Sequence, residues 1–386
     1  MLRVLTLSTL FPSAAEPALG PFVARQTLEL ARQPGIALEV ASPVGLPRWP
    51  LSLHPHYAAR AALPAEESWE GIKVHRPRFA VWPKLGAART PAAIADAMTP
   101  LVRSGGFDAI DAEFFWPDGP AAAILSRRLG IPFSIKARGS DIHYWAGRPG
   151  IREQIVEAGR TADGLLAVSS AMKADMAALG LPPEKIRVHH NGVDLDLFRP
   201  LDRAEAKRRL GIEGPLIVTI GTLIRRKGQW LAIDALRDLP GASLVLIGDG
   251  PDRAALEREA AGAARVRFTG SIPQDEIARW LAAADVMLLP TEREGLANVW
   301  LEALACGTPV VTSDVGGARD VFDRPELGRL AALDRGAIVE AVSDLFALPP
   351  DQSALREAAS RFSWEANGRA LAAHLGEIAE RRLRAA

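Results

Sequence analysis

The feature of the sequence that most constrains its fold is an alternation of short apolar runs with longer amphipathic ones, which continues from end to end. Such an alternation is typical of parallel sheets with helices on both faces, because each buried strand is followed by a segment that crosses back over the sheet. The sequence therefore predicts an α/β protein. Strands are expected at residues 3–10, 37–44, 72–79, 108–115, 132–139, 164–170, 186–193, 215–222, 243–250, 265–270, 285–291 and 309–313.

The chain has 386 residues, which exceeds the size at which one hydrophobic core stops growing. We therefore expect two domains, with a sheet in each. A polar stretch with a short basic helix, residues 191–215, separates the two series of strands and is interpreted as the interdomain linker. Ligands of open α/β sheets bind outside the carboxyl ends of the strands, so two such domains face to face would place the site in an interdomain cleft.

The composition excludes some classes of protein. Lysines plus arginines number 46 and acidic residues also number 46, so the broad positive charge of a nucleic-acid-binding protein is missing. The single cysteine, Cys306, lies in an apolar helical run and cannot form an intrachain disulfide. No apolar run reaches the ~18 to 20 residues that span a bilayer, and the N-terminal apolar run is interpreted as a buried strand. A cytoplasmic location fits these features.

Two carboxylates, Glu294 and Glu302, lie eight positions apart in an otherwise apolar segment. Glu294 follows a predicted strand, and Glu302 lies one to two turns into a predicted helix over 297–307. On a helix that spacing corresponds to ~12 Å, too far for the two groups to share a proton. They could instead bind two sets of hydroxyl groups around an anion held at the helix N-terminus. On spacing alone, the pattern favours the simpler alternative, a solvated Glu294 and a Glu302 that merely pairs with a neighbour.

The stretch EGLANVWLEALACGTPVVTSDVGGARDV (294–321) resembles the signature of the retaining glycosyltransferases of family 4, also called glycosyl transferases group 1, here in a subgroup with an ARGSD loop. Further matching stretches, in the order of the family, are HHNGVDLDLFRP (189–200), GTLIRRKG (221–228), LVLIGDGP (244–251) and FTGSIP (268–273). The resemblance implies a GT-B fold, in which two Rossmann-like domains with parallel sheets face an interdomain cleft. It implies an N-terminal acceptor-binding domain over 1–192, a nucleotide-sugar-binding domain over 193–363, and a last helix, about 364–386, that packs back on the first domain.

By this resemblance, the second domain binds the donor. Glu294 would contact the sugar hydroxyls, Glu302 the ribose diol, and Lys227 with Arg226 the phosphates. Thr222 stands where the family usually has arginine, and Arg225 or Arg226 would supply that charge. The remaining donor-binding residues implied are Gly221, Gly248, Gly250, Gly270, Ser271, Ile272, Gly295, Leu296, Ala297, Asn298 and Val299. Of these, Gly270, Ser271 and Ile272, together with Pro273, would form the base site.

In the first domain, the resemblance implies that Gly20 lies near the diphosphate, with Phe22 beside it. Arg138 is a departure, because many members have histidine there and another histidine where Glu113 stands. A permanently charged Arg138 cannot shuttle a proton, but it could bind a phosphate or a sugar oxygen. Asp141 would orient Arg138, and a plain Arg138–Asp141 salt bridge is the structural alternative. Asn191, in the HHNGVD stretch, is a further candidate contact.

No metal or other cofactor is expected, since Lys227 and Arg226 can neutralise a diphosphate. The DLD stretch at 194–196 looks like a metal-binding motif of another glycosyltransferase fold, but its setting favours a linker. Residues 43–90 interleave aromatic and basic side chains, which could dock a lipid-linked acceptor or a membrane surface peripherally, or simply form loops over a sheet.

The resulting hypothesis is a cytoplasmic enzyme that transfers a sugar from a nucleoside diphosphate to the hydroxyl of a glycan or lipid-linked saccharide with retention of configuration. Peripheral association with the inner face of the cell membrane is an additional option. The hypothesis implies no nucleic-acid partner. Two alternatives are a sugar-nucleotide epimerase of the same fold and a non-catalytic protein that binds a sugar nucleotide.

Overall fold

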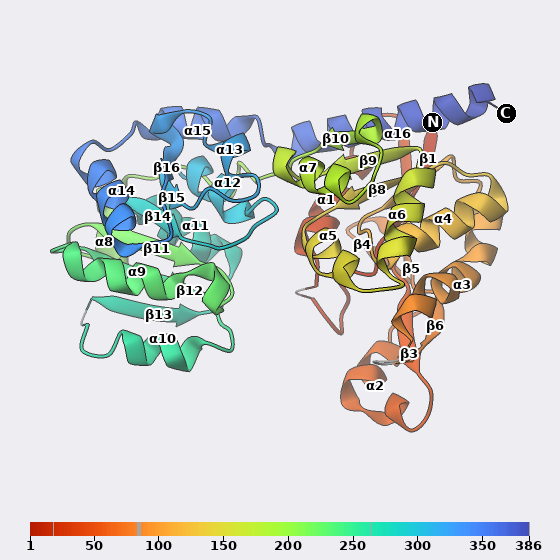
Figure 1. Ribbon diagram of the computed structural model, residues 1–386, viewed down its shortest axis with the longest axis horizontal. Helices are drawn as coiled ribbons and strands as arrows, with labels where there is room; N and C mark the ends of the chain where they lie inside the picture. Colours follow the sequence, from red (N-terminus) through yellow and green to blue (C-terminus); the bar gives the residue numbers. More distant parts are fainter. Residues whose placement is uncertain (18, 83–85, 264, 386) are drawn as a thin grey trace. The chain divides into compact units, whose positions relative to one another are not determined.

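The computed structural model describes residues 1–17, 19–82, 86–263 and 265–385, without the side chains of residues 383 and 385. Positions 83–85 of the region 43–90, position 18 beside Gly20, and position 386 of the C-terminal segment lie outside the described residues. The chain forms two compact units: unit 1 is Met1–Asn191 with Trp364–Ala386, and unit 2 is Gly192–Ser363. Each unit contains its own sheet (Figure 1).

Unit 1 is built on an eight-stranded sheet in which every neighbouring pair is parallel except the pair at one edge, β5 and β4. The strands, in order across the sheet, are β10 (Ile186–Val188), β9 (Gly164–Ala167), β8 (Phe133–Ala137), β7 (Ala109–Ala112), β1 (Leu2–Leu7), β2 (Ile36–Ala41), β5 (Ile72–His75) and β4 (Glu66–Trp69). Every residue of β7, β8 and β9 is buried, as expected of strands that are covered on both faces.

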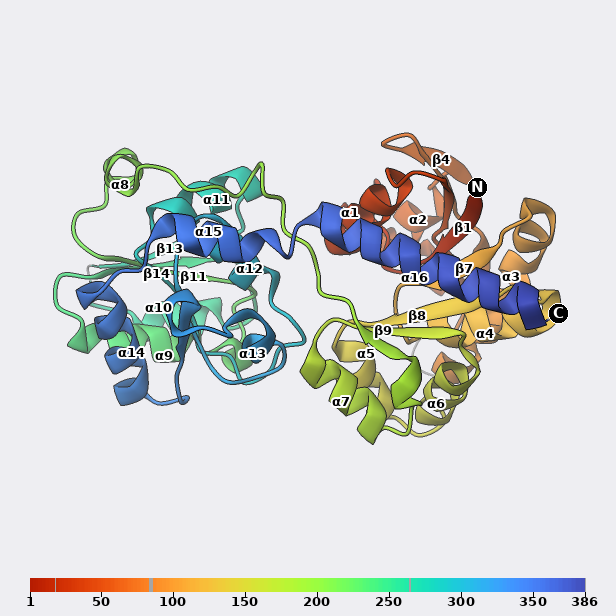
Figure 2. The ribbon, with the colours of Figure 1, turned by 90° about the horizontal axis from the view of Figure 1, so that it is seen from above.

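Helices cover both faces of this sheet. The last helix, α16 (Trp364–Ala385), packs against α1 (Pro21–Ala31) and runs across β7 and β8 (Figure 2). Its Leu371, Leu375 and Ile378 share an apolar cluster with Val4 and Leu30. The other helices of unit 1 are α2 (Pro55–Ala61), α3 (Thr90–Gly105), α4 (Asp118–Leu129), α5 (Ser140–His143), α6 (Arg152–Thr161) and α7 (Ser170–Ala178).

A separate two-stranded parallel sheet of β3 (Val44–Pro47) and β6 (Arg78–Val81) lies within the region 43–90. The sequence did not predict β3, β4 or β6 as strands of their own, and it offered loops over a sheet as one interpretation of this region. That interpretation is wrong, because the region forms these strands, β5, α2 and a short 3-10 helix, Leu51–Leu53.

Unit 2 contains a six-stranded, fully parallel sheet. Its strands, in order, are β13 (Val266–Gly270), β12 (Ser243–Ile247), β11 (Leu216–Ile220), β14 (Val286–Leu289), β15 (Val310–Thr312) and β16 (Gly328–Leu330). Its helices are α8 (Arg203–Leu210), α9 (Gln229–Ala235), α10 (Arg253–Glu259), α11 (Gln274–Ala283), α12 (Asn298–Ala305), α13 (Ala318–Val321), α14 (Arg335–Ala347) and α15 (Gln352–Ser360). The predicted α/β class, with parallel sheets in two Rossmann-like halves, is confirmed.

The predicted linker over 191–215 needs one correction. Its helix, α8, packs against α11 and forms part of unit 2. The Nζ atom of Lys207 pairs with Asp285, and the guanidinium of Arg203 donates to the carbonyl of Gly307 at 2.8 Å. The polar composition of α8 therefore reflects contacts to the surface of unit 2 rather than a free connection.

Candidate active site

The residues predicted to bind the donor collect at one edge of the unit 2 sheet. Because all six strands are parallel, the turns that follow β11, β12, β13, β14 and β15 emerge at the same edge. These turns are joined by backbone hydrogen bonds. The Leu223 amide donates to the Asp249 carbonyl at 3.0 Å, and the Gly248 amide donates to the Gly270 carbonyl at 2.9 Å. Gly221, Gly250, Ser271 and Ile272 lie in the same three turns.

The central polar contact of this edge is an ion pair between Lys227 and Glu294, in which Lys227 Nζ donates to Glu294 Oε1. Lys227 follows β11 and Glu294 follows β14, so the pair bridges two neighbouring strands. The buried hydroxyl of Thr291 donates to the same carboxylate oxygen at 3.1 Å. The Glu292 amide donates to the Arg226 carbonyl at 2.8 Å, which fixes one turn against the other.

The turn that holds Glu294 depends on Gly316. Gly316 has a φ of +52°, and a Cβ atom added there would lie 2.0 Å from the carbonyl oxygen of Glu294. The next residue, Gly317, donates its amide to the Gly295 carbonyl at 2.8 Å. The double glycine after β15 thus permits the close approach that places the Glu294 turn.

Arg226 and Arg225 extend the positive charge of this edge. Arg226 is exposed, and its guanidinium donates to the carbonyl of Arg293 at 3.1 Å. Arg225 is also exposed, but its guanidinium lies 4.9 Å from the centre of the Trp230 ring. Of the two arginines proposed to replace the missing charge at Thr222, Arg226 is the one whose side chain reaches the Glu294 turn.

Helix α12 begins at Asn298, directly after Gly295, Leu296 and Ala297, and Val299 is its second residue. Its N-cap residue, Ala297, makes no side-chain hydrogen bond to the helix N-terminus. The backbone N–H groups of a helix N-terminus and the helix dipole favour an anion. The turn therefore presents an anion-binding helix end beside the Lys227–Glu294 pair.

Glu302 lies one turn further along α12. Although the residue is not fully buried, the protein packed around its carboxyl group raises the pKa to about 7. Among the described residues, this carboxyl group has neither a hydrogen-bond donor nor a cation as partner. The alternative that Glu302 pairs with a neighbour is therefore wrong, and the carboxyl group is available to hydroxyl donors.

In unit 1, the candidate residues also lie at the carboxyl edge of a parallel sheet. Gly20 and Phe22 lie at the start of α1 after β1, Glu113 follows β7, Arg138 and Asp141 follow β8, and Asn191 follows β10. Gly20 has a φ of +58°, and a Cβ atom there would lie 1.8 Å from the carbonyl oxygen of Leu10. This close approach explains a glycine at the entry to α1.

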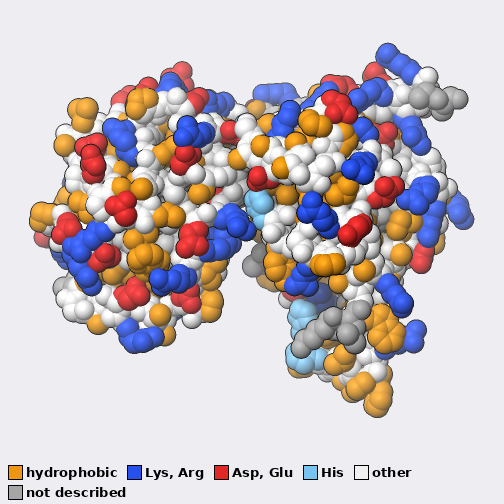
Figure 3. Space-filling model, viewed as in Figure 1, with side chains coloured by type: hydrophobic (Ala, Val, Ile, Leu, Met, Phe, Trp, Pro, Cys, Tyr) orange, Lys and Arg blue, Asp and Glu red, His pale blue; other side chains and the backbone are white. Residues whose placement is uncertain are grey.

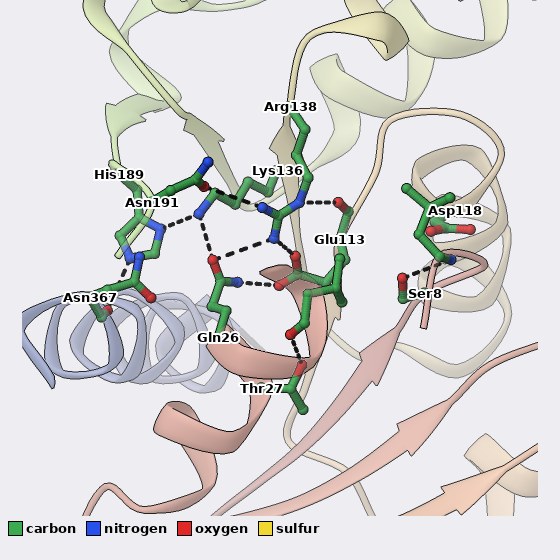
Figure 4. A network of polar contacts seen from close by, with 12 residues as sticks. Ser8, Gln26, Thr27, Glu113, Asp118, Lys136, Arg138, His189, Asn191 and Asn367 are labelled. Carbon is green, nitrogen blue, oxygen red and sulfur yellow. Dashed lines mark hydrogen bonds and ion pairs between the residues drawn. The ribbon is translucent and has the colours of Figure 1, made fainter. Parts of the chain in front are cut away.

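Arg138 pairs with Glu113, not with Asp141 (Figure 4). Its Nε atom donates to the Glu113 carbonyl at 3.0 Å, and its Nη2 atom donates to the Glu113 carboxylate. The guanidinium lies 4.8 Å from the centre of the Phe22 ring. Weaker contacts reach Asn191 and Gln26, both at 3.4 Å. The side chains of Arg138 and Glu113 are 5% and 0% exposed.

Asp141 acts on the backbone. Its carboxylate accepts the amide of Arg138 at 3.1 Å, of Gly139 at 2.8 Å and of Phe115 at 3.1 Å. Burial nevertheless raises its pKa. The structural alternative of an Arg138–Asp141 salt bridge is therefore wrong, whereas Asp141 does hold the main chain from which the Arg138 side chain extends.

The structure adds residues that the sequence did not single out. Gln26 of α1 receives a hydrogen bond from Lys136 Nζ at 2.6 Å and donates to Glu113. Lys136 is fully buried and also contacts His189 Nδ1 at 2.9 Å (Figure 4). Burial lowers the pKa of both Lys136 and His189 well below their ordinary values. It also raises the pKa of the neighbouring Asp111.

A sequence signal for this network existed only in part. Asp111, Glu113, Lys136 and Arg138 are charged residues within or just after apolar strands, where a charge is costly unless it has partners. Gln26 carries no such signal, because a polar residue on a helix is ordinary.

The DLD stretch forms a local turn. The Asp194 carboxylate accepts the backbone amides of Asp196 and Leu197, both at 3.1 Å. Aspartate commonly stabilises a turn in this way.

Comparisons with known proteins show which family the chain resembles. The family model described as Glycosyltransferase Family 4 matches residues 29–197, and the one described as Glycosyl transferases group 1 matches residues 214–347. The chain is 29% identical over 355 residues to the putative teichuronic acid biosynthesis glycosyltransferase TuaC of Bacillus subtilis, covering 89% of this chain and 88% of that one. It is 32% identical over 288 residues to the GDP-mannose-dependent alpha-(1-6)-phosphatidylinositol monomannoside mannosyltransferase of Mycolicibacterium smegmatis, covering 68% and 75%.

Solved structures share the fold. A sucrose-phosphate synthase from Thermosynechococcus elongatus superposes with a TM-score of 0.81 at 21% identity, over 100% of both chains. Anabaena Alr3699/HepE in complex with UDP-glucose superposes with a TM-score of 0.71 at 19% identity, over 98% of this chain and 100% of that one. These likenesses confirm the predicted GT-B fold. Together with the matched family models and relatives, they show that the chain belongs to the glycosyltransferases of family 4, the glycosyl transferases group 1.

Proposed function

We propose that this glycosyltransferase takes a sugar from a nucleoside diphosphate donor and transfers it to an acceptor hydroxyl with retention of the anomeric configuration. The observation that carries the proposal is the edge of the unit 2 sheet. There the Lys227–Glu294 pair joins two adjacent turns, and α12, which follows one of them, presents its N-terminus and the unpartnered carboxyl group of Glu302.

Each of these groups matches one part of such a donor. Glu294 accepts hydrogen bonds from the sugar hydroxyls, and Lys227 with Arg226 binds the diphosphate. The backbone amides from Gly295 to Val299 lie at the helix end that favours the same phosphates. Glu302 accepts hydrogen bonds from the ribose diol. The glycine turns at Gly221, Gly248 and Gly250, with the 270–273 stretch, form the remainder of the nucleotide site.

The reaction follows from this arrangement of charge. The bond between the anomeric carbon and the phosphate oxygen breaks through a state with positive character on the sugar, while Lys227 and Arg226 stabilise the negative charge that develops on the phosphate. The acceptor oxygen forms its bond on the same face, and its proton passes to the departing phosphate oxygen. Glu294 positions the sugar in this route and forms no bond to the anomeric carbon, because the acceptor oxygen attacks that carbon directly.

We propose that no metal ion is required, because the two cations and the helix N-terminus supply positive charge to the diphosphate. Addition of EDTA to the purified enzyme is expected to leave transfer unchanged. A loss of transfer that Mg²⁺ or Mn²⁺ restores would contradict this part of the proposal.

The acceptor is proposed to be a glycan or a lipid-linked saccharide bound by unit 1, in the synthesis of a polysaccharide or glycolipid in the cytoplasm. The relatives support this class, since one is named for teichuronic acid biosynthesis and another for a phosphatidylinositol mannoside. In unit 1, Gly20, Phe22 and Asn191 are the proposed contacts. Arg138 is already bound on several sides by protein acceptors, so we propose an electrostatic role for its charge. Relatives named as transferases favour transfer over the epimerase and the non-catalytic alternatives.

The test is a thermal-shift screen of the full chain with UDP-, GDP- and ADP-sugars. A true donor raises the melting temperature by mass action. UDP-glucose is the first candidate, because a structure of the same fold was solved with it, and GDP-mannose is the second. The donor found is then incubated with saccharide acceptors, with Lys227→Ala as the inactive variant and Leu348→Ala, an exposed position after α14, as the matched control. If no nucleotide sugar shifts the melting temperature, or if Lys227→Ala transfers sugar as well as the parent, the proposal is wrong.

A further inference from the structure

An outlying part of unit 1, which we call the tip, comprises residues 44–62 and 78–82. It contains the β3–β6 sheet, the short 3-10 helix Leu51–Leu53 and α2, and it projects from the rest of unit 1 (Figure 1). Neither the 3-10 helix nor α2 buries a single side chain. Elements without fully buried side chains gain little from the hydrophobic effect within the chain. Their exposed apolar residues are therefore candidates to contact another molecule.

The tip exposes large apolar side chains. Trp49 is 77% exposed, Leu51 53%, Leu53 71% and Trp82 53%. The strands β3 and β6 are parallel and pair Pro47 with Val81, so the residues that follow them emerge at the same end of the small sheet. Trp49 and Trp82 therefore belong to one surface. Figure 3 shows apolar and histidine side chains gathered over this part of the molecule.

The side chains of the tip that carry a full charge are all positive. Residues 44–65 and 75–91 contain no aspartate or glutamate. Arg48 and Arg78 are exposed, and the Arg48 guanidinium lies 5.4 Å from the centre of the Trp82 ring. Arg60 and Arg76 are paired with Glu16 and Glu67 and do not add to the exposed charge.

We propose that the tip docks the enzyme on the surface of a bilayer that contains anionic lipids. Tryptophan prefers the interface between lipid headgroups and acyl chains, leucine inserts below it, and arginine is attracted to anionic headgroups. In the described residues no helix is long and apolar enough to cross a membrane, and α2 has seven residues, so the tip would lie on the surface.

Two other occupants fit the tip less well. A second copy of this chain would bring Arg48 and Arg78 of both copies together with no acidic residue of the tip to pair with them. A soluble saccharide could stack on the tryptophans, but Leu51 and Leu53 offer its hydroxyl groups no hydrogen bond. The inference uses none of the donor-binding residues, so it stands or falls independently of the proposed function.

The experiment is vesicle co-sedimentation of the full chain, without donor, on phosphatidylcholine alone and on phosphatidylcholine mixed with phosphatidylglycerol. The parent is expected to bind the mixed vesicles, and added salt is expected to weaken binding because it screens the arginines. The variant Trp49→Ala/Leu53→Ala is expected to bind at least about tenfold more weakly, since each truncation removes apolar surface that the bilayer would bury. Arg48→Gln should weaken binding only to the anionic vesicles.

Leu348→Ala is the matched control, because Leu348 is 78% exposed but lies in unit 2. It should bind like the parent, and all variants should keep the parent's melting temperature. Lipids brominated on their acyl chains should quench part of the tryptophan fluorescence, and Trp49→Phe/Trp82→Phe should lose that part. The proposal is overturned if the parent binds neither kind of vesicle, if the tip variants bind as well as Leu348→Ala, or if the tip variants abolish only a concentration-dependent dimer.

Discussion

Lys227 and Glu294 hold each other across two neighbouring strands of the unit 2 sheet, and their side chains are only 16% and 11% exposed. A cation and a carboxylate with separate proposed tasks, one on the phosphates and one on the sugar, thus define each other's position. Their charges cancel in part, so each is stabilised at a site where an isolated charge would be costly.

Substitutions of Lys227 and Glu294, singly and together, should show that the two residues affect transfer jointly. Lys227→Met is expected to lower kcat about 100-fold or more, since a cation that stabilises the leaving phosphate acts mainly in the transition state. Glu294→Gln should also lower it, and the double variant should lose clearly less than the product of the two single effects, because the two residues act as one unit. Steady-state kinetics of the three variants measure this. Strictly multiplicative effects would contradict a functional pair.

Glu302→Gln should change stability and donor binding in opposite directions. The folded-state pKa of Glu302 is about 7, above its ordinary 4.5, so ionisation of the carboxyl group weakens folding as the pH rises from 4.5 and does so fully above 7. Glutamine carries no such charge. The variant should therefore be more stable than the parent at pH 8, by about 1 to 3 kcal/mol, and about equal to it at pH 4.

At pH 8 the same variant should bind the donor about 10- to 100-fold more weakly, because a charged acceptor for the ribose diol is lost. Donor affinity of the parent should rise between pH 6 and pH 8 as Glu302 ionises. Urea unfolding at pH 4 and pH 8 measures the change in stability. Calorimetric titration with the donor at pH 6 and pH 8 measures the change in affinity. If the variant gains stability but binds donor unchanged, Glu302 does not contact the donor.

The gathering of the unit 2 candidate residues at one edge could be predicted from the sequence, because most of them lie in short turns at the ends of buried strands. Once the strands are recognised, parallel pairing brings those turns to one edge, as for Gly248, Gly270 and Glu294. The partner of each side chain could not be predicted in this way. The sequence assigned Lys227 and Glu294 to different parts of the donor, and only the structure shows that they pair.

In unit 1 the sequence predicted less. Arg138 and Asp141 are close in sequence, which suggested a local pair, but Asp141 binds the backbone and Arg138 pairs with Glu113, 25 positions away. Long-range partners such as Gln26 depend on how α1 packs beside the sheet. The small strands β3, β4 and β6 escaped prediction because they are four residues long. Two of the four residues are exposed in β4 and in β6, and the mostly buried β3 contains Gly45 and Pro47.

Gly316→Ala is expected to destabilise unit 2 and to reduce transfer. A Cβ atom at this position would lie 2.0 Å from the Glu294 carbonyl oxygen, and alanine is strained at a φ of +52°. The turn must move, so the loss of stability should be about 2 kcal/mol or more, with weaker donor binding. The control is Gly336→Ala in α14, where the nearest atom lies at 3.5 Å and alanine favours the helix by about 0.5 to 1 kcal/mol. Equal effects of the two substitutions would show that the Glu294 turn tolerates the change.

Glu113→Gln should be among the most destabilising single changes in unit 1. It removes the carboxylate that binds Arg138, whose side chain is 5% exposed. It also introduces an amide N–H group near the N–H groups of Arg138 and Gln26 that donate to this carboxylate. Breaking a buried pair from one side typically costs about 3 to 5 kcal/mol, whereas removing both partners costs much less. Glu113→Leu/Arg138→Met should therefore be more stable than Glu113→Gln alone.

Asp314→Asn provides the matched control, because it breaks the pair with Arg319, whose side chains are 47% and 75% exposed, and should change the free energy of unfolding by less than about 1 kcal/mol. Chemical unfolding of the four proteins separates the cases. If the double variant is folded but transfers no sugar, the charge of Arg138 serves the reaction. If it transfers normally, the pair holds only the fold of unit 1, and the proposed electrostatic role of Arg138 is wrong.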